Sequence, residues 1–297
     1  HKIMAHPQRK GEMDDEEILN ALGFLYPHLD IQSKNISFPP FEEFLSLVVA
    51  AEDFSFRDSF FEDGYWQQKK KCTLRKLTDY IAHCSIEAEE QILISNFALS
   101  LKDGDVVVTF NWDTLVERAL FKLNRKINFF ERDSNGITVL KLHGSLNWIE
   151  LPEGTSLKYP DSVDWLIEEK IYRTKDFHYP AGNWDVMDKP PLIIPPIAFK
   201  KFSNHKLLPK LWHEAFNSII ESEFCCVIGY SLPPEDLQSR ALFSAALGKM
   251  INKETYTLIN PDPSVGGRFY TQISPQLSFI QKYFTGDVLE AILKQLK

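Results

Sequence analysis

The sequence predicts an α/β protein with a doubly wound parallel sheet, a helical N-terminal region and an inserted segment over the sheet. Three observations predict this fold. Apolar side chains recur at helical spacing through the first hundred residues. From residue 106 onward, short β-branched runs alternate with helical stretches, which is the order of a parallel sheet. Residues 151–190 interrupt that alternation with prolines, two glycines and scattered aromatic side chains.

The composition allows a substantial folded core. The chain has 297 residues, of which 44% are hydrophobic and 13% aromatic, and it carries a net charge of −8. We expect a single domain over residues 1–297, with a helical layer at about 14–101 and the insertion at about 151–190. The acidic balance gives no sign of a direct nucleic-acid site. The basic run Lys69–Lys71 is interpreted as a solvated helix face.

The helical layer is predicted from capping and periodicity. Four acidic residues, 14–17, precede Ile18, as in the first turn of a helix. Phe41, Phe44, Leu45 and Val48 then lie on one helical face. The later apolar positions of the same kind are Leu74, Leu77, Ile81, Ile86, Leu93, Ile94 and Phe97.

The strands are predicted from continuous apolar runs, which suit strands covered on both faces. These runs are 106–108, 137–142, 192–194, 224–228 and 256–259. The helical stretches among and after them are 114–123, 208–221, 237–247 and 288–296. Such strand–helix alternation is typical of a Rossmann-like sheet.

Cysteine usage and hydropathy limit the classes of protein. None of the four cysteines forms a Cys-x-x-Cys pair, so no metal site is expected. Cys225 and Cys226 lie in an apolar run and are interpreted as small buried residues of a reduced, cytoplasmic compartment. No apolar stretch has the length of a membrane span, and no signal peptide is visible. The sequence begins at His1 rather than at a methionine, as a processed or shortened chain does.

Polar residues and glycines follow four of the predicted strands. In an open α/β sheet, ligands bind outside the carboxyl ends of the strands, so these residues are expected to line one crevice. They are Asn111 and Asp113, then His143, then Gly229 and Ser231, and finally Asn260.

Each of these residues also has a purely structural interpretation. Asn111 and Asp113 suit the N-cap of the helix that starts near residue 114. His143 could be a structural histidine, or a general base with access to substrate beside a glycine turn. Gly229 could serve only to turn the chain, or it could let backbone N–H groups approach a ribose or phosphate.

Several motifs give these positions a specific meaning. Residues 109–115, Thr-Phe-Asn-Trp-Asp-Thr-Leu, resemble the Asn-x-Asp-x-Leu signature of the sirtuin-like (silent-information-regulator-like) NAD-consuming family. Residues 142–148, Leu-His-Gly-Ser-Leu-Asn-Trp, are similar to its His-Gly segment, in the version found in bacterial anti-phage defence proteins. The segments 193–196, 227–233 and 259–261 resemble later family blocks in the right order, and residues 41–45 resemble an early helical stretch. The resemblance covers roughly residues 40–297.

The resemblance implies an NAD glycohydrolase that cleaves NAD to nicotinamide and ADP-ribose and acts in defence by NAD depletion. It implies that Asn111 orients the nicotinamide ribose and the water, and that His143 is the general base. Asp113 would hydrogen-bond the nicotinamide amide or position Asn111. Ser231 and Asn260 would contact the adenosine half of NAD, with Gly229 beside them.

Two departures from the family pattern keep other functions open. The family opens with a strand and a Gly-Ala-Gly-x-Ser-type loop that cradles the NAD pyrophosphate, and no Gly-x-Gly occurs in these 297 residues. This departure favours a non-catalytic NAD or ADP-ribose-binding module. The zinc-binding cysteine pairs of sirtuin deacylases are also missing, which favours the hydrolase over an NAD-dependent protein deacylase. A hydrolase that depletes NAD must be restrained, so we expect a separate regulatory or sensor protein, or a homo-oligomer.

Overall fold

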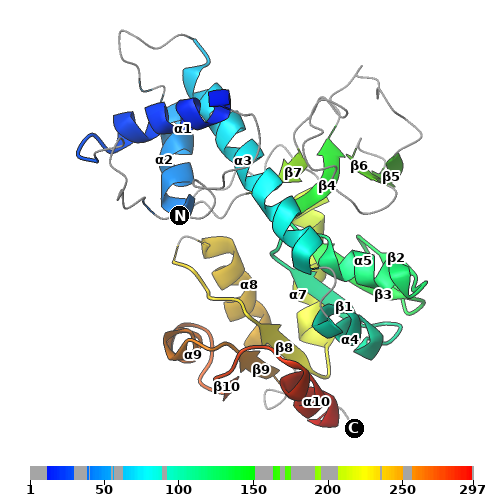
Figure 1. Ribbon diagram of the computed structural model, residues 1–297. Coiled ribbons are helices and arrows are strands. Elements are labelled where there is room, and N and C mark those ends of the chain that lie inside the picture. Colours follow the sequence, from blue (N-terminus) through cyan, green and yellow to red (C-terminus); the bar gives the residue numbers. More distant parts are fainter. Residues whose placement is uncertain are drawn as a thin grey trace. The chain divides into compact units, whose positions relative to one another are not determined.

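The protein is described by a computed structural model. It describes residues 12–29, 39, 41–54, 56, 63–88, 92–150, 163–167, 171–174, 191–194, 207–234, 236–249 and 256–295. The chain divides into two compact units, the first made of residues 1–87 and 146–200 and the second of 88–145 and 201–297. Each unit is described by itself below, and the elements are labelled in Figure 1.

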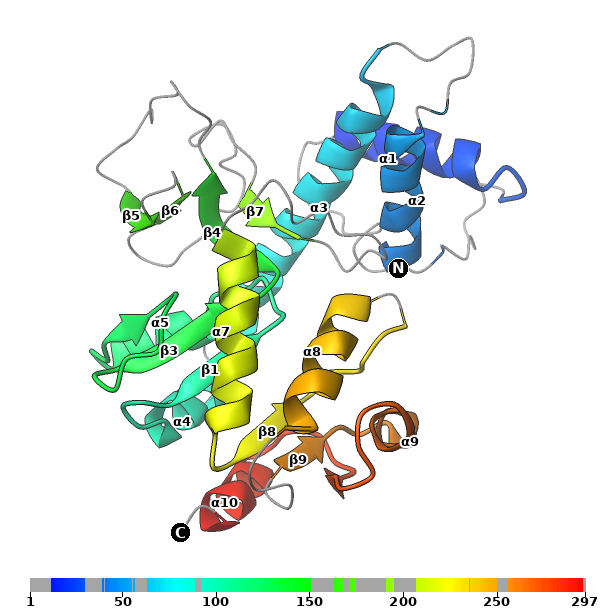
Figure 2. The ribbon, with the colours of Figure 1, turned by 180° about the vertical axis from the view of Figure 1, so that it is seen from behind.

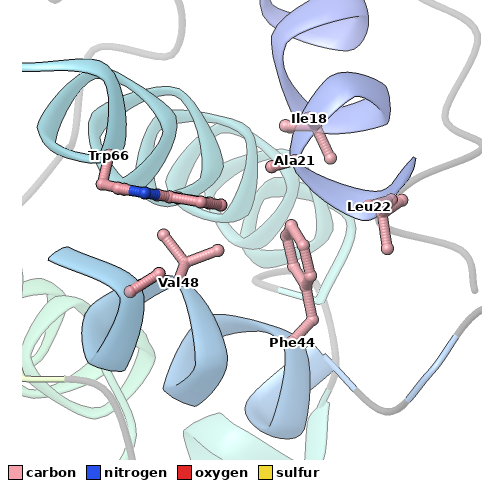
Figure 3. Packing of buried hydrophobic residues seen from close by; sticks show 7 residues of the cluster. Ile18, Ala21, Leu22, Phe44, Val48 and Trp66 are labelled. Atoms are coloured by element: carbon pink, nitrogen blue, oxygen red, sulfur yellow. The ribbon is translucent and has the colours of Figure 1, made fainter. Parts of the chain in front are cut away.

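Three helices form the N-terminal part of the first unit. They are α1 (Glu12–Leu25), α2 (Phe41–Asp53) and α3 (Tyr65–Ala88). Apolar side chains from all three pack into one buried cluster, which Figure 3 shows at close range. The cluster contains Ile18, Ala21, Leu22, Phe44, Val48, Ala51 and Trp66. The helical spacing in the sequence therefore identified this core correctly at Ile18, Phe44 and Val48.

The interpretation of the run Lys69–Lys71 as a solvated face is wrong for Lys69. Its side chain is only 3% exposed, pairs with Glu17 and lies over the Tyr65 ring, 4.2 Å from the centroid. Burial lowers the pKa of Lys69. The long aliphatic stem and the aromatic ring explain how a lysine fits there, whereas Lys71 is exposed as expected.

The remainder of the first unit contains a four-stranded sheet. Its strands are β4 (Gly144–Glu150), β5 (Val163–Ile167), β6 (Ile171–Thr174) and β7 (Pro191–Ile193), in the order β5-β6-β4-β7. β6 pairs antiparallel with both β4 and β5. The apolar run 192–194 was expected in the parallel sheet, and that expectation is wrong, because β7 lies beside β4 instead. Most of the predicted insertion, and the family-like prolines at 195 and 196, lie outside the described residues.

The second unit contains parallel strands with helices between them. Its first part runs α4 (Ile92–Ser100), β1 (Val106–Thr109), α5 (Leu115–Lys122), β2 (Ile127–Asn128) and β3 (Ile137–Lys141). Its second part runs α7 (Leu207–Glu221), β8 (Cys225–Ile228), α8 (Leu237–Leu247), β9 (Tyr256–Ile259), α9 (Pro263–Gln272), β10 (Ser278–Ile280) and α10 (Gly286–Gln295). The strands predicted at 106–108, 137–142, 224–228 and 256–259 are confirmed, as are the helices predicted between 114 and 296.

The parallel strands form two three-stranded sheets, β1-β3-β2 and β10-β9-β8. Ile137 and Val139 of β3 pack with α4 and α5. Successive side chains of a strand point to opposite faces, so Thr138 and Leu140 point away from those helices. α7 packs against β3, and it lies in front of that strand and beside α8 in Figure 2. α10 supplies Val288 to the core of the second sheet.

This part of the chain is therefore an α/β unit in which β3 and β9 are buried along their whole length, whereas β1 and β8 are mostly half-buried. In each sheet the carboxyl ends of the strands lie at one edge, which is where polar residues were expected to gather. Among the described helices, none has the length and apolarity that crossing a membrane requires.

Candidate functional site

A buried ion pair fixes the loop that follows β1. Lys141 of β3 donates from its ammonium group to the backbone carbonyl of Asp113. The same ammonium group lies 2.9 Å from Glu117 of α5, and the two side chains are 0% and 2% exposed. A buried charge is tolerated only when it is paired and hydrogen-bonded, so these contacts fix the loop against β3 and α5. Neither Lys141 nor Glu117 was singled out from the sequence.

Asn111 and Asp113 lie in this loop but make different contacts. The Asp113 carboxylate accepts a hydrogen bond of 3.1 Å from the backbone N–H of Leu115, the first residue of α5. This bond satisfies one N–H of the first turn, although the N-cap position of α5 is Thr114, whose side chain makes no capping bond. The backbone N–H of Asn111 donates to the Thr109 hydroxyl at 3.0 Å, and the Asn111 side chain is exposed. The helix-cap interpretation of Asn111 is therefore wrong, and its amide is available to a ligand.

His143 follows β3 and is buried. Only 3% of its surface is exposed, so the expected position with open access beside a glycine turn is not what the structure has. Gly144 does form the turn, with a φ of 76°. The Trp212 indole N–H of α7 donates to the carbonyl of Leu142 at 3.1 Å, which fixes the backbone just before the histidine.

Aromatic rings enclose the imidazole. The Phe110 ring meets it edge-on at a centroid distance of 5.4 Å, and the Trp212 ring lies 6.0 Å away. Phe110 also stacks on Tyr230, with centroids 4.5 Å apart, and both of these rings pack against Phe243 of α8. Phe110 follows β1 and Tyr230 follows β8, so these contacts join the carboxyl ends of the two parallel sheets.

Asn260 brings the end of β9 into the same cluster. Its side-chain amide donates to the carbonyl of Tyr230 at 3.5 Å, and its side-chain oxygen accepts from the backbone N–H of Asp262 at 2.9 Å. The residue is 6% exposed. Asn260 therefore ties the loop after β8 to the turn before α9, which is a structural task in addition to the predicted ligand contact.

Asp236, which immediately precedes α8, also approaches His143. Its carboxylate oxygen Oδ2 is 3.6 Å from His143 Nε2, and Asp236 is 1% exposed. The same oxygen accepts hydrogen bonds from the Tyr230 hydroxyl at 2.8 Å and the Ser239 hydroxyl at 2.5 Å. Burial raises the pKa of Tyr230, and the charge of Asp236 raises it further, so the phenol remains a neutral donor.

The loop after β8 contains the predicted Gly229 and Ser231. Gly229 has a φ of +71°, where a side chain would strain the backbone, and its N–H donates to the Ile259 carbonyl at 2.9 Å. The turning role of Gly229 is confirmed. The Ser231 side chain is exposed, and its carbonyl accepts from two nitrogens of the Arg268 guanidinium, at 2.9 and 3.2 Å.

The sequence did not identify every residue of this cluster. Phe110 and Tyr230 lie within the motifs, but a sequence motif does not show that their two rings stack. Asp236 follows two prolines and precedes an apolar helix, which signals a helix cap and gives no indication of a nearby histidine. Trp212 and Phe243 lie in helices far along the chain, and only the tertiary fold brings them together.

Within the described residues, no three His, Cys, Asp or Glu side chains are grouped in a way that could hold a metal ion. The chain matches no protein-family model and none of the curated proteins with which it was compared.

Proposed function

We propose that the second unit binds NAD and hydrolyses the bond between nicotinamide and ribose. One observation supports this most strongly. The four segments whose motifs resemble those of the sirtuin-like family, after β1, β3, β8 and β9, contact one another through Phe110, His143, Tyr230 and Asn260. These segments are far apart in the sequence, yet they lie together at the strand ends, where open α/β sheets bind ligands.

The proposed hydrolysis requires only a few protein side chains. The nicotinamide ring of NAD is a pyridinium, so it leaves as a neutral amine when the bond to ribose C1′ breaks, and the ribose develops oxocarbenium character. Water adds to C1′ and loses a proton, which gives ADP-ribose. In the proposal, the exposed amide of Asn111 orients the ribose and the water, and His143 accepts the proton. Such base catalysis typically contributes about 10²–10⁴ in rate.

The other predicted residues have supporting roles in the proposal. The Asp113 carboxylate accepts from the backbone N–H of Leu115 and so holds the loop that contains Asn111, and it can also meet the nicotinamide amide. Ser231 presents an exposed side chain to the adenosine half of NAD, together with the backbone at Gly229. Asn260 shapes this part of the site through its bond to the Tyr230 carbonyl.

The burial of His143 adds a step before chemistry. His143 is 3% exposed, and the Phe110 ring, which stacks on Tyr230, meets its imidazole edge-on. In the proposal, a ribose reaches His143 after a local rearrangement of the groups that cover it. Excluding water until then suits an oxocarbenium-like reaction, which must meet one placed water rather than bulk solvent.

The proposal includes a Rossmann-like arrangement of the parallel strands and a setting in which NAD depletion protects bacteria against phage. Both rest on the family resemblance of the motifs. A regulatory partner or self-association would then hold the activity back until it is needed.

The experiment that tests the site compares variants in a nicotinamide-release assay with purified protein and NAD. Asn111→Ala and His143→Gln are expected to abolish release, while Tyr283→Ser, a change at a side chain that is 74% exposed, is expected to leave it unchanged. Full release by His143→Gln in a folded protein would remove the histidine from the mechanism.

A further inference from the structure

We propose that Arg268 of α9 binds a phosphate group of a nicotinamide dinucleotide, beside the exposed side chain of Ser231. This inference rests on the proposed function, which brings the adenosine half of NAD to the loop after β8. It extends that function by naming a cationic residue outside the family-like motifs and by giving its ligand as a phosphate.

Arg268 lies at the edge where open α/β sheets bind ligands. β8 and β9 are neighbouring parallel strands, and the guanidinium reaches from the helix after β9 to the loop after β8. Its Nε and Nη2 donate to the Ser231 carbonyl at 3.2 and 2.9 Å, and Nη1 donates to the Ser264 hydroxyl at 3.0 Å. The cation is therefore fixed at the carboxyl ends of both strands.

The guanidinium retains donors and charge for a ligand. An arginine has five N–H groups, so one N–H on each terminal nitrogen makes no hydrogen bond within the described part of the chain. Within the same residues, no carboxylate lies at ion-pair distance from Arg268. Two N–H groups on neighbouring nitrogens of a half-buried cation suit the oxygens of a phosphate.

Asp262 is an acidic side chain near Arg268, but its hydrogen bonds are made elsewhere. Its carboxylate accepts from the backbone N–H of Ser264 at 2.8 Å. Hydrogen bonds from Ser264, and to a smaller extent the charge of Arg268, lower the pKa of Asp262. Asp262 is thus occupied at the start of α9 and leaves the guanidinium without a direct anionic partner.

Buried contacts fix the loop that receives Arg268. Leu232 has a φ of 52°, which residues other than glycine seldom adopt, and its side chain is 0% exposed. The Asn260 amide donates to the Tyr230 carbonyl in the same loop. The relative positions of Ser231 and Arg268 are therefore set before a ligand arrives, which lowers the free-energy cost of binding.

A simpler explanation makes Arg268 only a link between α9 and the loop after β8. Two substitutions separate the roles. Arg268→Gln removes the charge, whereas Arg268→Lys keeps the charge and loses the planar fork of donors. A mere link would be weakened by both substitutions, and the loss would be the same for ligands with and without phosphate. A phosphate-binding residue responds to charge, and only for ligands that contain a phosphate.

The test measures binding of ADP-ribose, ADP-ribose 2′-phosphate and adenosine by isothermal titration calorimetry. Arg268→Gln should weaken ADP-ribose binding by about 10- to 100-fold, the usual effect of losing hydrogen bonds to a charged group. Arg268→Lys should weaken it by less than about 10-fold, because the ammonium group still attracts phosphate. The affinity for adenosine should be the same in all three proteins. With NAD, KM should rise in Arg268→Gln while kcat changes little.

Arg125→Gln is the matched control. Arg125 also donates to a backbone carbonyl, that of Leu101 at 3.1 Å, but it precedes β2 at the amino end of that strand. Its substitution should leave the affinity for ADP-ribose unchanged. The 2′-phosphate probe identifies the phosphate: an equal loss for both ADP-ribose probes in Arg268→Gln indicates the pyrophosphate, and a loss confined to the 2′-phosphate probe indicates the 2′-phosphate of NADP. Either result supports the inference.

A second measurement does not depend on the folding of Arg268→Gln. In nitrogen-15 NMR of arginine-labelled wild-type protein, the Arg268 Nε signal, assigned by its loss in Arg268→Lys, should shift with a phosphate-containing probe and not with adenosine. An unshifted signal would overturn the inference. So would unchanged affinity of Arg268→Gln for both phosphate probes, an equal loss for adenosine, or a wild-type chain that binds neither phosphate probe. If phosphate binding depends on Arg268 but the wild-type chain releases no nicotinamide from NAD, the inference stands and the proposed hydrolysis fails.

Discussion

Asn111 and Asp113 are two residues apart, yet the structure gives them separable tasks. The Asp113 carboxylate accepts from the backbone N–H of Leu115, whereas the Asn111 side chain is exposed and does not cap the helix. The substitution Asn111→Ala should therefore change the free energy of unfolding by no more than about 0.5 kcal/mol, as is usual at surface positions. It should nevertheless abolish nicotinamide release. Thermal unfolding and release, measured on the same preparation, check both statements.

Asp113→Ala is the control, because we expect it to lower the stability of the protein, whereas Asn111→Ala should not. Loss of the hydrogen bond to Leu115 should cost about 0.5–1.5 kcal/mol of stability, the usual net contribution of one hydrogen bond. If Asn111→Ala lowers the stability as much as Asp113→Ala does and the protein still cleaves NAD, the role of Asn111 is structural.

The thiols of Cys225 and Cys226 are expected to be unreactive in the native chain. Both are free, and burial raises the pKa of each to about 12. The thiolate is the reactive form, so alkylation at neutral pH should be very slow and should accelerate only as the pH approaches 12 or as the chain unfolds. Mass spectrometry of native and urea-unfolded protein after iodoacetamide treatment measures this. Equal labelling of the two samples would show that the folded chain does not shield these thiols.

At the scale of elements, the pair Lys141–Glu117 links β3, α5 and the loop between β1 and α5. Lys141→Met should destabilise the protein by about 3–5 kcal/mol, because it leaves a buried carboxylate without its partner. The double substitution Lys141→Met with Glu117→Leu should recover much of that loss. Urea unfolding of the two variants measures the difference. A single variant as stable as the double would show that the pair does not anchor the loop.

Neighbouring glycines in α9 offer a matched pair for the packing of that helix on β10. A Cβ atom at Gly266 would lie 2.6 Å from the Phe279 ring, whereas one at Gly267 would meet nothing within 4 Å. Gly266→Ala should cost about 1–3 kcal/mol from overpacking. Gly267→Ala should instead stabilise the helix by up to about 1 kcal/mol, the difference in helix propensity. Two variants with the same unfolding midpoint would contradict the packing of α9 against Phe279.

On the scale of the whole molecule, the local sequence patterns predicted the helices and strands correctly more often than they predicted the contacts between them. The strands at 106–108, 137–142, 224–228 and 256–259 were predictable because apolar runs record burial on both faces. The strand at 192–194 was assigned to the wrong sheet, since such a run does not specify its partner. Lys69 was misplaced for a similar reason, because the charge pattern does not reveal that Glu17 and Tyr65 lie beside it.

The candidate site was predictable only in part. The residues at the strand ends could be found because a parallel sheet gathers its carboxyl ends at one edge. That His143 is buried, that Asn260 bonds the Tyr230 carbonyl and that Asp236 approaches the histidine depend on tertiary packing. Periodicity and spacing contain no information on such contacts.

We propose that this chain hydrolyses NAD without an acyl-lysine acceptor. The decisive experiment incubates the purified protein with NAD, alone and with an acetyl-lysine peptide, and quantifies nicotinamide and ADP-ribose. We expect equal amounts of both products from NAD alone, with no dependence on the peptide. Nicotinamide released only with the peptide would indicate a deacylase, and binding of NAD with no release under either condition would indicate a sensor; either result would contradict the account.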